Sequence, residues 1–156
     1  MDFRITGLDP APFQPLFAMS DAELRNHATV RCIATDAMPG LPCRVSVAHA
    51  LPGEELILTS FQHQEGASPY RASGPIFVRR SATLAFDAVN TVPQPVRERL
   101  VSVRAYDRHD CIVDAEVLEG AVFESTLERF FGQSAVRYLH VHYARRGCYA
   151  CKVTRA

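Results

Sequence analysis

The feature that most constrains the fold is a pair of segments, residues 100–106 (LVSVRAY) and 111–118 (CIVDAEVL), in which apolar and polar side chains alternate. Alternation with a period of two places the apolar side chains on one face of a strand and the polar ones on the other. The four polar residues 107–110 (DRHD) separate the two segments, and short polar connections of this kind join antiparallel strands. The chain is therefore expected to build an antiparallel sheet with one buried face.

Other short segments also have the composition of strands. Runs rich in β-branched or apolar residues are bounded by turn signals, including Pro-Gly at 39–40 and 52–53, and they predict strands at 2–6, 29–35, 43–47, 54–61, 75–80 and 82–86. Prolines 10, 12 and 15 predict an extended arm at residues 8–17. The 156 residues have the length of one domain.

Helix signals are few. Ser20 and Glu23 have the spacing of a capping box, with Met19 and Leu24 at the positions of a hydrophobic staple. A turn of helix is predicted at 95–100 and a longer amphipathic helix at 122–131, where Gly132 would end it. The expected fold is α+β: a single domain over residues 1–156, with a mainly antiparallel curved sheet and two or three short helices.

Charge and composition exclude several classes of protein. Lys plus Arg and Asp plus Glu each number 17, so the positive field that nucleic-acid binding requires is missing. No apolar run approaches the length of a membrane span. The N-terminal residues lack the pattern of a signal peptide, so we expect a cytoplasmic protein whose five cysteines stay reduced. Nucleic acid and membrane are not expected partners.

The most unusual stretch is HVHYARRGCYAC, residues 140–151, within a hairpin predicted at 136–153. A two-residue turn at Arg146 and Gly147 would pair His142 with Cys151. His140, His142 and Cys151 would then share one strand face, whereas Cys148 would lie on the other. This register argues against a Cys-x-x-Cys redox or four-ligand zinc site, because both need the two sulfur atoms together. A bulge near Gly147 would overturn that argument, so redox chemistry stays a further alternative.

The same register allows a different metal site. His140, His142 and Cys151 would supply three ligands and leave one position open, as a catalytic zinc site does, so zinc is the candidate cofactor. The alternative interpretation is structural: His and aromatic side chains often fill a half-buried sheet face. The pattern alone leaves both open.

A second candidate site is the segment 62–74 (QHQEGASPYRASG), which has no periodicity and reads as a long loop. Arg71, Tyr70, Ser73 and Gly74 could present a guanidinium, hydroxyls and a backbone amide to a small anionic molecule. His63, at the entrance of the segment, could move a proton. A purely structural loop is the alternative.

Three longer segments resemble a known family: FRITGLDPAPFQPLF (3–17), SPYRASGPIFVRR (68–80) and LHVHYARRGCYACKVTR (139–155). They are similar to the bacterial family called domain of unknown function 1203, over nearly the whole chain. The resemblance implies a bacterial single-domain protein of this length. It implies no activity, cofactor or catalytic residue.

Two function classes follow. In the first, the 62–74 loop folds over the sheet face that carries His140 and His142 and forms a small-molecule site, with Arg71 holding an anion. In the second, the chain is a non-catalytic structural or protein-interaction module in which the His and Cys residues only pack a core, and the Pro-rich arm lies on the surface or contacts a partner subunit, a homodimer being one candidate assembly. The reaction, the substrate and the strand order stay open, as does whether His63, Arg71 and His142 meet.

Overall fold

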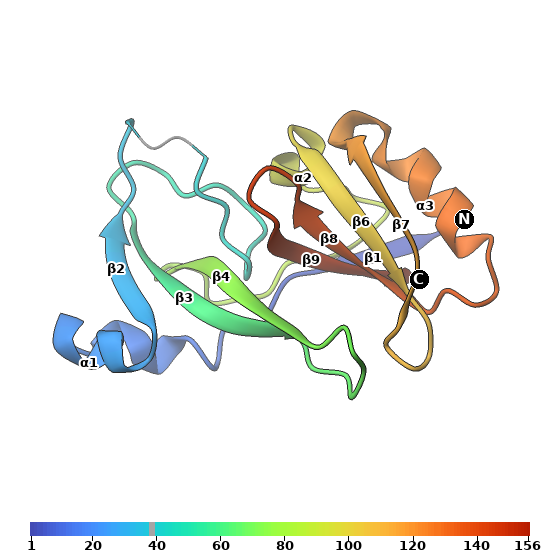
Figure 1. Cartoon of the computed structure of the whole chain (residues 1–156). Coiled ribbons are helices and arrows are strands. Elements are labelled where there is room, and N and C mark those ends of the chain that lie inside the picture. Colours follow the sequence, from blue (N-terminus) through green and yellow to red (C-terminus); the bar gives the residue numbers. More distant parts are fainter. Residues whose placement is uncertain (38–39) are drawn as a thin grey trace.

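The computed structural model describes residues 1–37 and 40–156 and contains two antiparallel sheets (Figure 1). Its larger sheet has six strands in the order β5-β1-β9-β8-β6-β7. Their bounds are β1 Phe3–Thr6, β5 Asp87–Val89, β6 Leu100–Tyr106, β7 Ile112–Glu119, β8 Tyr138–Tyr143 and β9 Cys148–Arg155. The smaller sheet has the order β2-β3-β4, with β2 Thr29–Ile33, β3 Glu55–Gln64 and β4 Ala72–Arg79. The expected α+β class with antiparallel pairing is confirmed.

Short helices flank the two sheets. They are α1 Asp21–Asn26, α2 Gln94–Arg97 and α3 Phe123–Phe131, with 3-10 turns at Gln14–Ala18 and Gly120–Val122. The capping box that begins α1 is present, since Ser20 accepts from the Glu23 amide and Glu23 accepts from the Ser20 amide. In Figure 1, α1 lies beside the smaller sheet and α3 beside the larger one.

Two apolar cores match the two sheets. The larger core contains the inward side chains of β6, β8 and β9 together with one face of α3, including Phe123, Leu127 and Phe130. The second core lies under β3 and β4, where Phe13 and Phe17 pack against Ile57 and Ile76. The Pro-rich arm thus lies on the surface over much of its length but anchors to the core through these two phenylalanines.

Two of the expected strands are wrong. Residues 43–47 form only a turn with isolated bridges, Cys43 to Phe77 and Pro42 to His49, and Val47 has a left-handed φ of 45°. Residues 82–86 also lie outside the strands, although the Phe86 amide donates to the Val45 carbonyl. Segment 43–47 is apolar because it packs onto the cores, and burial without a ladder looks like a strand in sequence. In 82–86 only Ala82 is buried and Phe86 partly so, whereas Leu84 is 82% exposed, so this apolar run marks neither a strand nor a buried face.

The long loop at 62–74 is also a wrong prediction at its ends. β3 extends to Gln64 and β4 begins at Ala72, so only residues 65–71 connect the strands, and a register shift lies between Gln62 and Gln64. Among the polar side chains of these strand ends, Gln62, His63 and Gln64 line the pocket described below. The turn expected at Pro39-Gly40 includes Pro39, which lies outside the described residues. No helix within residues 1–37 and 40–156 is long and apolar enough to cross a membrane.

Candidate functional site

The two candidate segments meet where the end of β3 crosses the face of β8 and β9. His63 comes from β3, and its imidazole ring centroid lies 5.0 Å from that of His142 and 6.2 Å from that of His140, both on β8. The rings of His140 and His142 are 6.4 Å apart. Each histidine has one ring nitrogen within 4.8 Å of the corresponding nitrogens of the other two. Remote parts of the sequence thus build one cluster of three imidazoles.

The hairpin of β8 and β9 differs from its expected register. Tyr143 pairs with Cys148 across a four-residue turn, and His142 pairs with Tyr149. A β-bulge then intervenes, so that Cys151 pairs with Val141 and not with the expected His142. Paired residues share a face, so Cys151 lies on the core side, away from the histidines. The expected His140, His142 and Cys151 ligand set is therefore corrected: Cys151 does not face the site.

The expected separation of the two cysteines is wrong for the same reason. Cys148 pairs with Tyr143 and Cys151 with Val141, which are both on the face opposite the histidines. Cys151 is fully buried, and this burial raises the pKa of its thiol to about 12. All five cysteines are free thiols.

Burial keeps the histidines neutral. His140 is 4% exposed and His142 is fully buried. Removal from water lowers the pKa of each to about 3, and Arg104 adds a repulsive charge in both cases. Half-buried His63 has its pKa lowered by the same two causes, burial first. A neutral imidazole keeps a lone pair on one nitrogen, which is the form that binds metals.

Each of the three histidines has one buried ring nitrogen without a hydrogen-bond partner. His142 Nδ1 lies 3.0 Å from the Gly147 carbonyl oxygen and donates to it, since a carbonyl only accepts. Its Nε2 therefore carries the lone pair, and this buried atom has no hydrogen-bond partner. The buried Nδ1 atoms of His63 and His140 also lack partners. Unpaired buried polar atoms are uncommon in proteins and call for an explanation.

Three neutral imidazoles are a donor set found in catalytic zinc sites, although their present spacing is wider than bound zinc would require. Two nitrogens bound to tetrahedral zinc at about 2.0 Å lie about 3.3 Å from each other. The three ring nitrogens now lie within 4.8 Å of one another, so each pair would need to approach by about 1.5 Å or less. His142 already has the outer hydrogen bond to a carbonyl that is usual for metal-binding histidines. The fourth position would face the pocket, because His63 and His140 line it.

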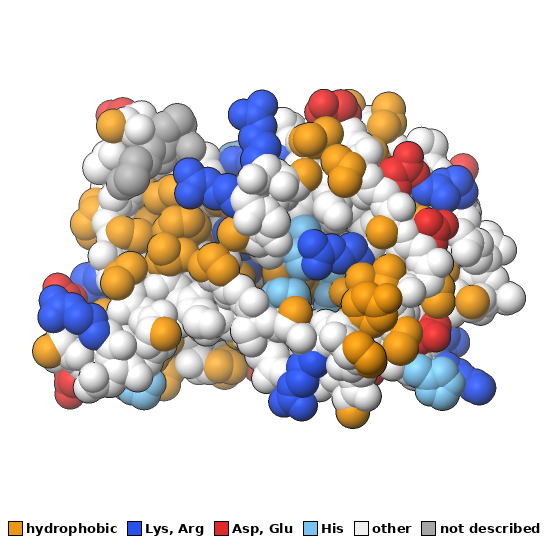
Figure 2. Space-filling model, viewed as in Figure 1, with side chains coloured by type: hydrophobic (Ala, Val, Ile, Leu, Met, Phe, Trp, Pro, Cys, Tyr) orange, Lys and Arg blue, Asp and Glu red, His pale blue; other side chains and the backbone are white. Residues whose placement is uncertain are grey.

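A pocket of about 410 Å³ opens over the histidines. Its lining comes from both sheets, from two hairpin tips and from the Pro-rich arm: Leu8, Phe61, Gln62, His63, Gln64, Glu65, Gly66, Asp110, Tyr138, His140, Tyr149 and Lys152. Figure 2 shows histidine side chains in a hollow near the middle of this face, with basic side chains beside them. The volume suits a small molecule.

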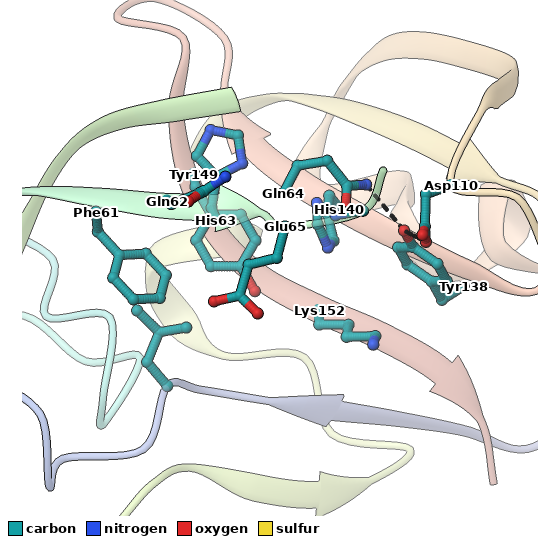
Figure 3. A pocket seen from close by; sticks show the side chains of 12 residues that line it. Phe61, Gln62, His63, Gln64, Glu65, Asp110, Tyr138, His140, Tyr149 and Lys152 are labelled. Atoms are coloured by element: carbon teal, nitrogen blue, oxygen red, sulfur yellow. Dashed lines mark hydrogen bonds between the residues drawn. The ribbon is translucent and has the colours of Figure 1, made fainter. Parts of the chain in front are cut away.

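One wall of the pocket is a polar relay that links the two sheets. The Tyr138 hydroxyl donates to Asp110 Oδ1 at 2.6 Å and accepts from Gln64 Nε2 at 2.8 Å (Figure 3). The Ser68 hydroxyl donates to the Asp110 carbonyl at 2.7 Å, so the tips of the β3–β4 and β6–β7 hairpins are joined. Burial is the main cause that raises the pKa of Tyr138, and the hydrogen bond to Asp110 is the second. This wall holds β3, and with it His63, against the larger sheet.

The opposite wall is aromatic. Tyr149 stacks on His63 with ring centroids 5.3 Å apart and an interplanar angle of 3°, and it meets His140 edge-on at 5.1 Å. Figure 3 shows Tyr149 and His63 deep in the pocket. These contacts fix the rotation of both imidazole rings.

The structure separates the predicted site residues into two groups. His63, His140 and His142 come together, and a Cβ placed on Gly74 would lie 4.0 Å from His63 Nε2, so Gly74 adjoins the cluster. Arg71 instead lies at the exposed side of the hairpin, where its guanidinium bonds Gln62, and neither Arg71, Tyr70 nor Ser73 lines the pocket. The shared site therefore does not include the expected anion-binding arginine.

Several pocket residues gave little signal in the sequence. In the sequence, Asp110 looks like an ordinary turn residue and Gln64 like part of a polar loop. Lys152 can be placed on the same sheet face as the histidines only when the bulge is known. Tyr138 begins the strand that carries the histidines and lies two residues before His140. This period-two spacing was the sequence signal that could have placed Tyr138 on the same face as the histidines.

Comparison with known proteins bears on the family but not on the chemistry. No curated protein and no solved structure matches the chain significantly. The model of a family described as "Protein of unknown function (DUF1203)" matches residues 40–155, a range that includes all three histidines and the whole pocket lining except Leu8. This match confirms the resemblance inferred from the sequence motifs, and the chain belongs to the DUF1203 family.

Proposed function

We propose that this protein binds a transition-metal ion, with zinc as the best match, through His63, His140 and His142, and that the metal's open position serves a small molecule in the adjoining pocket. The observation that carries the proposal is the convergence of three ring nitrogens within 4.8 Å, with unpartnered buried nitrogens on all three rings.

The ligand type supports zinc over harder cations. Imidazole suits zinc, copper, iron and nickel, whereas magnesium and calcium prefer oxygen ligands. Three protein ligands with an open fourth position are typical of catalytic zinc sites, while structural sites usually fill all four positions with Cys or His. None of the five cysteines joins the described cluster, which favours the open arrangement.

The expected chemistry is activation of water or polarisation of a carbonyl oxygen. A zinc ion lowers the pKa of its bound water toward neutrality and so supplies hydroxide to a substrate next to it. Glu65 lines the pocket, and in Figure 3 its carboxylate points into the open space, where it could accept a proton from that water. Hydrolysis or hydration of a small molecule is therefore the proposed reaction class.

Metal analysis by mass spectrometry tests the proposal on protein made without a histidine tag. About one zinc or other transition-metal ion per chain is expected in the parent, and loss of that metal in His63→Gln. His63 is the best position for the variant because it is half-buried, whereas His140 and His142 are core residues. His109→Gln, in the exposed β6–β7 turn, is the matched control.

Two outcomes would contradict the metal site. One is a parent that holds no metal after dialysis against zinc. The other is equal metal content in His63→Gln and the parent. Either result would favour the alternative in which the three rings only pack between the two sheets with Tyr149.

A further inference from the structure

Two cations flank the histidine cluster in one row across the larger sheet. Arg104 on β6 pairs with His140 on β8, and His140 pairs with Lys152 on β9. Paired residues on neighbouring strands share a face and are about 5 Å apart. The row Arg104, His140 and Lys152 therefore places a positive charge on each side of a proposed metal ligand.

Neither cation is neutralised by the described part of the chain. Nine ion pairs lie within residues 1–37 and 40–156, and none of them includes Arg104 or Lys152. Both side chains are half-buried. The Lys152 ammonium lies 4.5 Å from the centre of the Tyr138 ring, and Figure 3 shows this side chain among the residues that line the pocket.

The two acidic residues of the pocket do not balance this charge. Asp110 accepts the hydrogen bond of the Tyr138 hydroxyl, so it serves the polar wall. Glu65 is exposed at the mouth and forms no ion pair. Three neutral histidines would also leave the full double charge on a bound metal ion. With a bound metal the site thus carries more positive charge than these two carboxylates balance, and an anionic ligand would compensate the excess.

We infer that the pocket binds a small oxyanion, a carboxylate or phosphate group, between the metal and the Lys152 side chain. Arg104 does not line the pocket, but it adds its positive charge from the other side of His140. This inference rests on the proposed metal site and adds the substrate class. The pocket volume of about 410 Å³ limits the ligand to a small organic acid or phosphate ester. The anionic group, bound at the metal and beside Lys152, would hold the molecule in the pocket.

Cobalt-substituted protein provides the test, because the visible absorption of cobalt(II) reports its coordination directly. The cobalt protein is titrated with acetate, with inorganic phosphate and with acetamide, which has the shape of acetate but no charge. The same titrations are made on Lys152→Gln and Arg104→Gln. Arg108→Gln is the matched control, since it removes one positive charge from the exposed β6–β7 turn.

The expected result is a saturable spectral change with an anion but not with acetamide. Lys152→Gln should bind cobalt normally and weaken anion affinity about tenfold, as expected for one lost partly screened charge, whereas Arg108→Gln should match the parent. A response to acetate alone assigns carboxylates, and one to phosphate alone assigns phosphates.

Two results would overturn the inference and are distinguishable. A cobalt spectrum that no anion changes, or equal affinity in Lys152→Gln and Arg108→Gln, removes the oxyanion site and leaves the metal site intact. A parent that acquires no cobalt spectrum removes the metal site and, with it, the oxyanion site.

Discussion

Acidification from pH 7 to pH 5 should destabilise the metal-free protein strongly, because His140 and His142 stay neutral in the fold. Both have a folded-state pKa of about 3, caused first by burial, against an ordinary value of 6.5. Below pH 6.5 the unfolded chain binds protons at these positions and the folded chain does not. Stability therefore falls as the pH falls from 6.5 towards 3.

The magnitude follows from the same linkage. At pH 5 each histidine is largely protonated in the unfolded chain only, which costs about 2 kcal/mol per residue and about 4 kcal/mol for the pair. The total stability of a domain is typically about 5–15 kcal/mol, so this loss is large. Carboxyl groups with a lowered pKa, such as Glu55 and Asp114, lose their contribution only below their ordinary values of 4.5 and 3.8, which lie outside the range from pH 7 to pH 5.

Urea denaturation at pH 7 and pH 5, with a chelator present, measures the effect. His140→Gln removes one of the two titrations and should reduce the pH-dependent loss by about 2 kcal/mol, even if the variant is less stable at pH 7. His109→Gln, in the exposed turn, should retain the full pH dependence. The relevant quantity is the difference between the two pH values within each protein.

Equal unfolding free energies at pH 7 and pH 5 would refute the reasoning, since they would mean that the buried imidazoles accept protons in the folded state. The same conclusion would follow if His140→Gln and His109→Gln showed the same pH dependence.

Three further predictions concern the scaffold of the site. Gly120→Ala should prevent stable folding, because the new Cβ would lie 1.9 Å from the Val96 carbonyl oxygen. Gly132→Ala is the control and should shift the thermal midpoint only slightly, because the nearest atom to its new Cβ would be 3.2 Å away. Tyr138→Phe should cost about 1–3 kcal/mol in urea denaturation by leaving its two partners unpaired, and a neutral result would show that they do not depend on the hydroxyl. Cys151 should resist thiol reagents in the native protein and react after unfolding, because burial raises its pKa to about 12; rapid native labelling would contradict this burial.

The alternating segments predicted the sheet well because their patterns reflect burial on one face. The β6–β7 hairpin, α1 with its capping box and α3 all follow local rules of this kind. The segment at 43–47 failed because it is buried by packing, without a strand partner along its length. The segment at 82–86 failed for a different reason: its residues are mostly exposed, with Leu84 at 82%. Local patterns report burial more directly than they report pairing.

The convergence of His63 with the C-terminal hairpin could not be derived from the sequence. His63 and His142 lie in different sheets, and their contact depends on how β3 crosses the larger sheet. That crossing is held by Asp110 and Ser68 at the hairpin tips and by Gln64 on Tyr138. Each of these residues reads locally as turn or loop chemistry.

The bulge in the last hairpin decides the chemistry of the site. The longer turn alone would not have changed which residues face the histidines. Replacing a two-residue turn by a four-residue turn shifts the pairing by two positions, and a shift by two keeps each side chain on the same face. The bulge adds one residue, Ala150, and therefore reverses the faces of all that follows. Cys151 moves to the core beside Val141, and Lys152 takes its place opposite His140. One extra residue exchanges a thiolate ligand for a free cation, which is why a site expected to contain His and Cys becomes a three-histidine site with a positive rim.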